Sequence, residues 1–403
     1  MELLDNPVRP YAWGSRTVIA GLLGQPVPSP HPQAELWLGA HPADPSRIVR
    51  PDGERTSLLD ALTADPGHLL GDARRSRWHD TLPFLLKVLA ADEPLSLQAH
   101  PSLEQAAYGF ERENAAGIAV DAPDRNYRDP HHKPELICAL TEFHALVGFR
   151  EPVETIALLR ALDVPQLAAH VELLAGQPGP DGLRALFTTW ITLPQSMLDE
   201  LVPALQEAAI RLVAAGGDFQ AEARTALDLS ERYPGDAGVL AALLLNRTTL
   251  QPGEALYLPA GNLHAYLSGA GIEIMANSDN VLRGGLTPKH VDVPELLRVL
   301  DFTAAPPPVI DGHPEAGWNS YDTPAAEFRL RRWMATEEDA KVAVPDGGPR
   351  ILLCTAGSAF VRGGDRVVEL AKGRALFLGA ADTATEVESA AAGTQLFLAS
   401  DGL

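Results

Sequence analysis

The pattern of apolar residues changes twice along this chain, and the changes separate strand-like regions from a helical one. Up to about residue 148, short apolar runs alternate with polar residues or are broken by Gly and Pro, which is typical of β-strands and tight turns. From Glu151 to about residue 235, Ala and Leu recur every three or four residues, the spacing of amphipathic helices. Strand patterns return at residue 239. This order predicts a β domain interrupted by an all-helical insertion.

A short internal repeat lies beyond the helical stretch. LQPGEALYLPA at 250–260 aligns without gaps with LAKGRALFLGA at 370–380, and Leu, Gly, Ala, Leu, Leu and Ala are identical. Short strands separated by Pro and Gly turns are typical of a jelly roll, so the repeat predicts a second, related barrel. At the same offset His264 falls on Ala384. We therefore expect the second copy to be a degenerate structural or interaction domain without a metal.

The predicted fold class is mainly β with an α-helical insertion: two jelly-roll β-barrel domains plus a helical domain. A chain of 403 residues exceeds what one hydrophobic core usually serves. We expect the first barrel to be built from residues 1–148 and 236–318, the insertion from 149–235 and the C-terminal domain from 319–403.

The charge balance excludes several classes of partner. The chain has 32 basic and 53 acidic residues, a formal net charge of -21, whereas nucleic acids and anionic membranes are bound by basic surfaces. A phosphorylated small molecule stays possible where a few cations gather. Two cysteines, Cys138 and Cys354, lie far apart in apolar runs, which predicts core thiols in a reducing compartment. No apolar run has the length of a membrane span. We expect a cytoplasmic monomer without nucleic-acid or membrane partners.

The segment PLSLQAHP, 94–101, carries a polar row on one face of a predicted strand. Side chains two residues apart share a face, so Ser96, Gln98 and His100 project together while Leu and Ala project to the other side. One interpretation is a barrel whose interior holds a metal; the other is a half-exposed strand whose polar row meets water.

A second polar row opens the strand HHKPELICAL. His131, Lys133 and Glu135 share one face and His132 points to the other. Pro134 cannot donate to a ladder, which places the segment at the start or edge of a strand. Taken alone, the segment fits equally well an exposed, charged strand start and a site that opens there.

A third segment, LPAGNLHAYL, contains His264. Taken alone, this residue fits a structural histidine in a turn as well as a metal ligand. Counted together, the polar positions of the three segments make a set of nitrogen and oxygen ligands of the kind that zinc accepts, namely Gln98, His100, Glu135 and His264.

The chain resembles the type I mannose-6-phosphate isomerases, zinc enzymes of the cupin class. The resemblance rests on seven segments in order: YAWGS, AELWLGAHP, PFLLKVL, PLSLQAHP, DPHHKPEL, LPAGNLHAYL and IEIMANSDNVLRGGLTPKH. The combination of LSLQAHP, HKPE and SDNVLRGGLTPK is highly specific, whereas each of these pieces alone is a weak signal. It implies one zinc per chain on Gln98, His100, Glu135 and His264. It also implies reversible isomerisation of mannose 6-phosphate and fructose 6-phosphate, with the helical insertion lying between two halves of the catalytic cupin domain.

The sequence departs from the family pattern at a few positions. Family members often have Asn at position 131, Ile and Val at positions 97 and 99, and a charged residue soon after His100-Pro101. These differences concern packing and the rim of the pocket. They leave the ligand set intact and loosen the assignment of phosphate contacts.

The reaction that the resemblance implies needs a cation, a base and a phosphate site. A proton moves between C1 and C2 through an enediol, whose oxyanion is stabilised by a metal and a nearby cation; Arg283 matches that cation in the family. The sequence leaves the base open among His132, Lys133, Glu273 and Asp279, and the two acids are equally suited to hold Arg283 or Lys133 in place. Substrate contacts are expected from Ser96, Lys87, Lys133, Arg283 and Lys289, with Trp13 as a wall.

Two other functions compete with catalysis of this isomerisation. A metal-bearing cupin that only binds or senses sugars needs no Arg283 and Lys133 in one pocket, and normally brings a DNA-binding or signalling domain, for which the sequence has no pattern. An iron-dependent cupin oxygenase prefers two or three histidines and one carboxylate, whereas here an amide, Gln98, takes one place.

Overall fold

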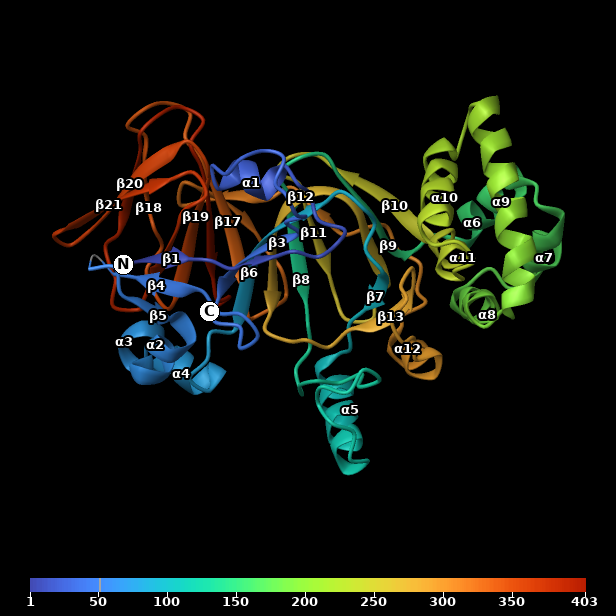
Figure 1. Cartoon of the computed structure of the whole chain (residues 1–403), viewed down its shortest axis with the longest axis horizontal. Coiled ribbons are helices and arrows are strands. Elements are labelled where there is room, and N and C mark those ends of the chain that lie inside the picture. Colours follow the sequence, from blue (N-terminus) through green and yellow to red (C-terminus); the bar gives the residue numbers. More distant parts are fainter. Residues whose placement is uncertain (51) are drawn as a thin grey trace.

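The computed structural model describes residues 1–50 and 52–403. The sheets occupy the centre and one end of an elongated molecule, a cluster of helices forms the other end, and helix α5 (Leu103–Ala115) projects from the middle (Figure 1). Helix and strand are present in comparable amounts, about 29% and 30%. The chain is therefore mixed rather than mainly β, because short helices also follow the strands outside the insertion: α1 (Val18–Leu22), α2 (Leu58–Ala64), α3 (Pro66–Leu70), α4 (Asp72–Trp78) and α12 (Val293–Val299).

The central sheet is antiparallel, and its main path runs β14-β11-β8-β12-β6-β3-β2 with β7, β9, β10 and β13 joined at the side. Its strands are β2 (Val8–Arg9), β3 (Glu35–Gly39), β6 (Phe84–Ala91), β7 (Leu97–Ala99), β8 (Glu135–Ala139), β9 (Phe143–Phe149), β10 (Leu245–Leu250), β11 (Ala255–Leu258), β12 (His264–Ala276), β13 (Leu282–Gly285) and β14 (Val309–Ile310).

Strand β12 belongs to two parts of this sheet. Its first residues pair with β7 and β9, whereas its second half, from Gly269 on, pairs with β6 and β8. The register shifts between Tyr266 and Ser268, and Gly269 has a φ of 115°, a conformation that favours glycine. A bulge followed by glycine lets a strand turn from one layer to another, so β12 brings residues of both layers around one interior.

The C-terminal strands form a nine-stranded sheet and a four-stranded sheet. They are β15 (His313–Glu315), β16 (Trp318–Tyr321), β17 (Arg329–Met334), β18 (Lys341–Ala343), β19 (Arg350–Ala356), β20 (Ser358–Gly363), β21 (Arg366–Ala371), β22 (Ala375–Leu378), β23 (Glu386–Ser389) and β24 (Gln395–Ser400).

Three strands from the beginning of the chain also join the larger C-terminal sheet. Strand β1 (Glu2–Asp5) pairs with β22, with Glu2 opposite Phe377, and β4 (Arg47–Val49) and β5 (Arg55–Ser57) extend that edge. The expected first segment, 1–148, is therefore shared between two sheets, because its opening strands complete the C-terminal one.

The helical region runs from α6 to α11, over α6 (Pro152–Leu162), a short 3-10 turn at Pro165–Leu167, α7 (Ala168–Gly176), α8 (Pro180–Ile191), α9 (Gln195–Ala215), α10 (Gln220–Arg232) and α11 (Gly238–Ala242). Proline at the first turn starts α6 and α8, where its missing N–H has no helical partner. Phe187 packs edge-on against Phe149 of β9, and both rings contact Phe302. The helices thus share a core with the central sheet. Within the part of the chain that the structure describes, no helix is long and apolar enough to cross a membrane.

Candidate active site

Three side chains converge in the interior of the central sheet: His100 directly follows β7, and Glu135 and His264 begin β8 and β12. Nε2 of His100 lies 3.4 Å and Nε2 of His264 lies 3.5 Å from Oε2 of Glu135. All three residues are buried: His100 is 1% exposed, His264 0% and Glu135 2%. These same three atoms have no hydrogen-bond partner among the described residues. Buried polar atoms are almost always paired, so three unpaired donor atoms aimed at one point fit a metal ion.

Backbone carbonyl oxygens orient the two imidazole rings through their Nδ1 atoms, on the side of each ring away from Glu135. Nδ1 of His100 lies 2.7 Å from the carbonyl oxygen of Asn280, and Nδ1 of His264 lies 3.1 Å from that of Asn262. An N–H at Nδ1 that donates to a carbonyl leaves the lone pair of Nε2 free for a metal. Burial lowers the pKa of His100 to about 4 despite the opposing charge of Glu135. Its ring is therefore neutral near pH 7, as a ligand must be.

Asn280 connects this support to the segment that carries Glu135. Its side-chain oxygen accepts the backbone N–H of Arg128 at 2.7 Å, and its amide nitrogen donates to the carbonyl oxygens of Asp129 and His131, each at 2.8 Å. The side chain is fully buried. Asn280 therefore fixes one loop against another around His100.

The strand register explains why residues far apart in sequence meet. His264 is opposite Gln98 across β12 and β7, and Arg283 is opposite Gln98 across β13 and β7. Directly opposite residues of antiparallel strands place their side chains on the same face. The three side chains consequently form one row, which brings the predicted amide ligand and the arginine beside the histidine.

A cleft of about 620 Å³ lies over this cluster. Its lining includes most of the predicted substrate and catalytic residues, namely Trp13, Lys87, Ser96, Gln98, Lys133, Asp279, Arg283 and Lys289. Lys133 is buried and its ammonium lies 3.0 Å from Oε1 of Glu135. Burial raises the pKa of Glu135, but Lys133 and His100 outweigh it, so the pKa lies well below its usual value and Glu135 is a carboxylate.

Three cations without acidic partners stand together on one side of the cleft. Arg128, Arg283 and Lys289 all line it, and none makes an ion pair among the described residues. Burial lowers the pKa of Arg283, and the nearby charge of Arg128 lowers it further; the pKa of Lys289 is lowered by burial, Arg283 and Arg128. In a chain of net charge -21, mutually repelling cations in one cleft fit an anionic ligand such as a phosphate.

The comparisons with known proteins agree with this geometry. Residues 1–152 match the family described as phosphomannose isomerase type I, catalytic domain. Mannose-6-phosphate isomerase of Escherichia coli is 39% identical over 390 residues, 96% of this chain and 97% of that protein, and the enzyme of Bos taurus is 34% identical over 94% and 93%. The chain belongs to the type I phosphomannose isomerase family. A solved zinc-bound mannose 6-phosphate isomerase superposes with a TM-score of 0.91 and 36% identity, over 100% of this chain and 99% of that one.

Membership of the phosphomannose isomerase family does not decide which side chain has which role, and two of the four candidate bases are not among the residues that line the cleft. His132 precedes β8 and does not line the cleft, and its Nε2 lies 2.7 Å from Oε1 of Glu327 in the C-terminal region. Glu273 lies beneath the cleft without lining it, because its carboxylate binds Lys87 at 3.0 Å and accepts the hydroxyl of Tyr266 at 3.0 Å. Both side chains are thus engaged by other residues and lie outside the lining of the cleft.

Asp279 reaches the cleft, but it holds neither Arg283 nor Lys133. Its Oδ1 lies 3.6 Å from Nε2 of His41, a buried histidine from the segment AELWLGAHP. The Asp279 side chain is 52% exposed. Its alternative role as an anchor for the two cations is therefore not supported, while its role in proton transfer stays open.

Sequence reasoning gave no site role to several cleft residues, among them Glu35, Trp37, His41 and Arg128. The first three lie in AELWLGAHP, a segment that contributed to the family resemblance but gave no signal of a role. Arg128 directly precedes DPHHKPE, and its proximity to the polar row that carries Lys133 was the available signal.

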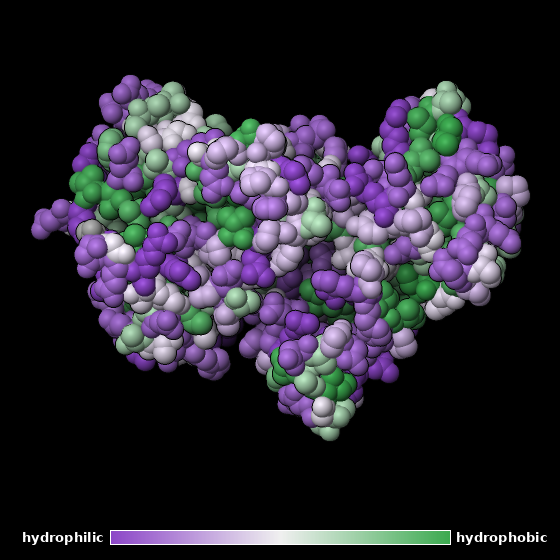
Figure 2. All heavy atoms as spheres, in the orientation of Figure 1, coloured by the Kyte–Doolittle hydropathy of each residue, from purple (hydrophilic) through white to green (hydrophobic). Residues whose placement is uncertain are grey.

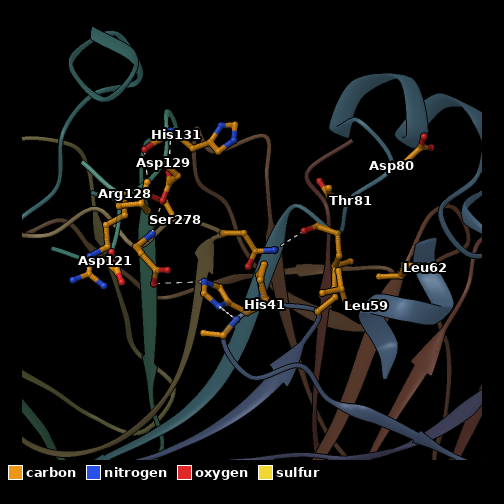
Figure 3. Close-up of a pocket in the computed structure, with 17 residues that line it drawn as sticks. His41, Leu59, Leu62, Asp80, Thr81, Asp121, Arg128, Asp129, His131 and Ser278 are labelled. Atoms are coloured by element: carbon orange, nitrogen blue, oxygen red, sulfur yellow. Dashed lines mark hydrogen bonds and ion pairs between the residues drawn. The ribbon is translucent and has the colours of Figure 1, made fainter. Parts of the chain in front are cut away.

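A second cavity of about 570 Å³ adjoins the cleft, between the α2–α4 lobe and the segment that follows α5. In the space-filling view the surface is notched between these two lobes (Figure 2). Figure 3 shows His41 between the apolar wall of Leu59 and Leu62 and the polar wall of Asp129 and Ser278. The two cavities share His41, Arg128, Ser278 and Asp279.

Proposed function

We propose that this chain interconverts D-mannose 6-phosphate and D-fructose 6-phosphate by transferring a proton between C1 and C2 through an enediol. Two neighbouring features support the proposal most strongly. One is the buried His100–Glu135–His264 donor set, and the other is the three cations of the cleft, which make no ion pair within the part of the chain that the structure describes. The relatives that align with nearly the whole chain are named after this activity.

In this proposal one zinc ion is held by His100, Glu135, His264 and Gln98. When bound, zinc supplies a Lewis acid that polarises a sugar oxygen. The protein residues hold it in place: carbonyls orient both rings, and Lys133 keeps Glu135 ionised. Bound by one carboxylate and otherwise by imidazole and amide ligands, a zinc ion would keep a net positive charge, which suits an oxyanion.

The cations divide between the reacting carbons and the phosphate. Arg283 stands in the row that contains Gln98 and His264, so its guanidinium is suited to the charge that develops at C1 or C2. Arg128 and Lys289 are then available for the phosphate, with Ser96 and Trp13 as further contacts. Lys133 and Asp279 are the predicted bases that line the cleft, and we propose that one of them moves the proton.

We also propose the finer arrangement of the chain, as two jelly-roll cupin barrels and a helical domain divided near residues 148, 235 and 318. Support comes from the turn of β12 between two layers and from the repeated turn and strand at β11 and β22. The chain is proposed to act as a cytoplasmic monomer on a small sugar phosphate, with no nucleic-acid or membrane partner. All proposed site residues come from one chain, and its net charge is -21.

A coupled assay on mannose 6-phosphate tests the proposal. We expect turnover that is lost on treatment with a chelator and restored by zinc, and elemental analysis giving about one zinc per chain. Binding of the sugar phosphate without turnover would favour the alternative of a metal-bearing cupin that only binds sugars. Active protein without a transition metal would contradict the metal site.

A further inference from the structure

Lys87 lies between two buried carboxylates at the floor of the cleft. Its Nζ is 3.0 Å from Oε2 of Glu273 and 3.6 Å from Oε1 of Glu35. Lys87 is opposite Glu273 across β6 and β12, and opposite Trp37 across β3 and β6. The three side chains therefore form a row across three neighbouring strands, with Glu35 two residues before Trp37 on the same face.

The two carboxylates differ in their access to the cleft. Glu273 does not line it, and the hydroxyl of Tyr266 donates to its second oxygen at 3.0 Å. Glu35 lines the cleft together with Lys87, and its Oε2 accepts the indole N–H of Trp37 at 2.7 Å. Lys87 is consequently held from below by Glu273 and from the side of the cleft by Glu35.

The second carboxylate is not needed to neutralise Lys87. Burial lowers the pKa of Lys87, but Glu273, Glu35 and Glu135 outweigh it and the pKa is raised, so Lys87 is an ammonium. Glu273 alone supplies a close counter-ion. Burying a further carboxylate carries a desolvation cost, and this one is held in a fixed orientation by Trp37, whose ring is itself packed edge-on against His41. Such a costly and oriented group fits a role at the cleft.

We propose that Glu35 is a positioning residue that holds the Lys87 ammonium on the cleft side of its pair with Glu273, where it binds the sugar phosphate. The inference rests on the proposed function. Without Glu35, the only ion-pair partner of Lys87 left among residues 1–50 and 52–403 is Glu273, and the ammonium relaxes away from the ligand. Lys87 then binds the substrate more weakly in the ground state and in the transition state alike. The loss of binding energy therefore raises KM more than it lowers kcat.

Glu35→Gln tests this role, since the amide keeps the size of the side chain and an acceptor for Trp37 while removing the charge. We expect KM for mannose 6-phosphate to rise on the order of 5- to 30-fold with kcat changed less than about twofold. Binding of mannitol 6-phosphate, which has no carbonyl and cannot isomerise, should weaken by a similar factor in calorimetry. Glu35→Asp, which keeps the charge, should recover part of the affinity and serves as the test variant if Glu35→Gln fails to fold.

A double-mutant cycle with Lys87→Met decides whether Glu35 acts through Lys87. We expect the double variant to bind mannitol 6-phosphate no more weakly than Lys87→Met alone. Additive losses, or a Glu35→Gln variant with wild-type KM, would overturn the proposal.

Glu295→Gln is the matched control, because Glu295 is another buried carboxylate that pairs with a basic side chain outside the cleft. It lies 3.1 Å from Arg112. An equal rise of KM in this control would also overturn it. Wild-type protein without isomerase activity would refute the proposed function instead, whereas active wild type with an unaffected Glu35→Gln refutes only this inference.

Discussion

Residues 250–264 and 370–384 share a turn and a strand, yet only the first stretch delivers a side chain to the candidate metal site. Gly253 and Gly373 both adopt positive φ, 96° and 79°, and lead into β11 and β22. The identical leucines are fully buried in both copies, Leu256 and Leu258 in the first and Leu376 and Leu378 in the second. Sequence identity is thus confined to the residues that form the turn and the core.

The loops after the two strands have different tasks. In the first copy, PAGN leads to His264, whose Nε2 faces His100 and Glu135. In the second copy, both carboxylate oxygens of Asp382 lie 2.8 Å from the N-terminal ammonium of Met1, and the N–H of Gly379 donates to one of them at 2.9 Å. The same frame therefore supports chemistry in one copy and attachment of the chain terminus in the other.

The largest effect is expected from removing the ligand of the first copy. His264→Ala deletes one of three converging donors, so we expect zinc affinity and activity to fall by more than about 100-fold, beyond what loss of a supporting group costs. Metal content by elemental analysis and turnover of mannose 6-phosphate measure both. A variant that keeps one zinc per chain and wild-type kcat would contradict the proposed site.

Arg283 tests whether the candidate site depends on its metal ligands alone. Arg283→Ala should lower kcat about 10²- to 10³-fold with little change in KM, since the guanidinium stands in the row of Gln98 and His264 where transition-state charge develops. Lys289→Ala is the contrast and should raise KM while kcat holds. Zinc content should stay at the wild-type value in both. An unchanged kcat with raised KM for Arg283→Ala would assign Arg283 to the phosphate.

Local periodicity predicted the parts of the site that depend on a single strand. The two-residue alternation separated Gln98 and His100 from their apolar neighbours, and it placed His132 on the face opposite to Glu135. The two copies of the short repeat were also predicted to form equivalent strands, and they do so as β11 and β22. This was possible because the leucines of the core and the glycine of the turn recur at fixed positions in the sequence.

Pairing between distant strands left no comparable signal. Glu35 reaches the cleft because β3 pairs with β6, and β1 joins the C-terminal sheet, where it pairs with the strand that contains Phe377. Neither pairing can be predicted from the residues within the strands themselves. Glu273 looked like a base because it is a carboxylate in a family motif, but its register opposite Lys87 makes it a counter-ion. Roles that depend on which strands are neighbours required the structure.

Asp382 provides a pH-dependent test of the second copy. Burial raises its pKa, but the N-terminal ammonium and the N–H of Gly379 outweigh it, so its pKa lies below the usual value. A lowered folded-state pKa adds stability above the unfolded value, about 3.9, that is lost as the pH falls toward the folded one. In a chain with Met1 as its free N-terminus, Asp382→Asn should lower the free energy of unfolding by about 1 kcal/mol at pH 7 and by less below about pH 4. Denaturant unfolding at both pH values measures this difference, which should leave zinc content unchanged; equal stability at pH 7 would refute the tie.

The smallest effect is expected from restoring the histidine to the second copy. Ala384 is exposed with a φ of 51°, a conformation in which histidine is tolerated better than most side chains, so Ala384→His should change the free energy of unfolding by less than about 1 kcal/mol. The variant should still bind about one zinc per chain and keep wild-type turnover. A metal site needs several converging donors, and within residues 1–50 and 52–403 the only such group of His, Cys, Asp and Glu is the one that contains His264. Elemental analysis giving two zinc ions per chain would contradict this expectation, since it would show that the second copy needs only this histidine to bind a metal.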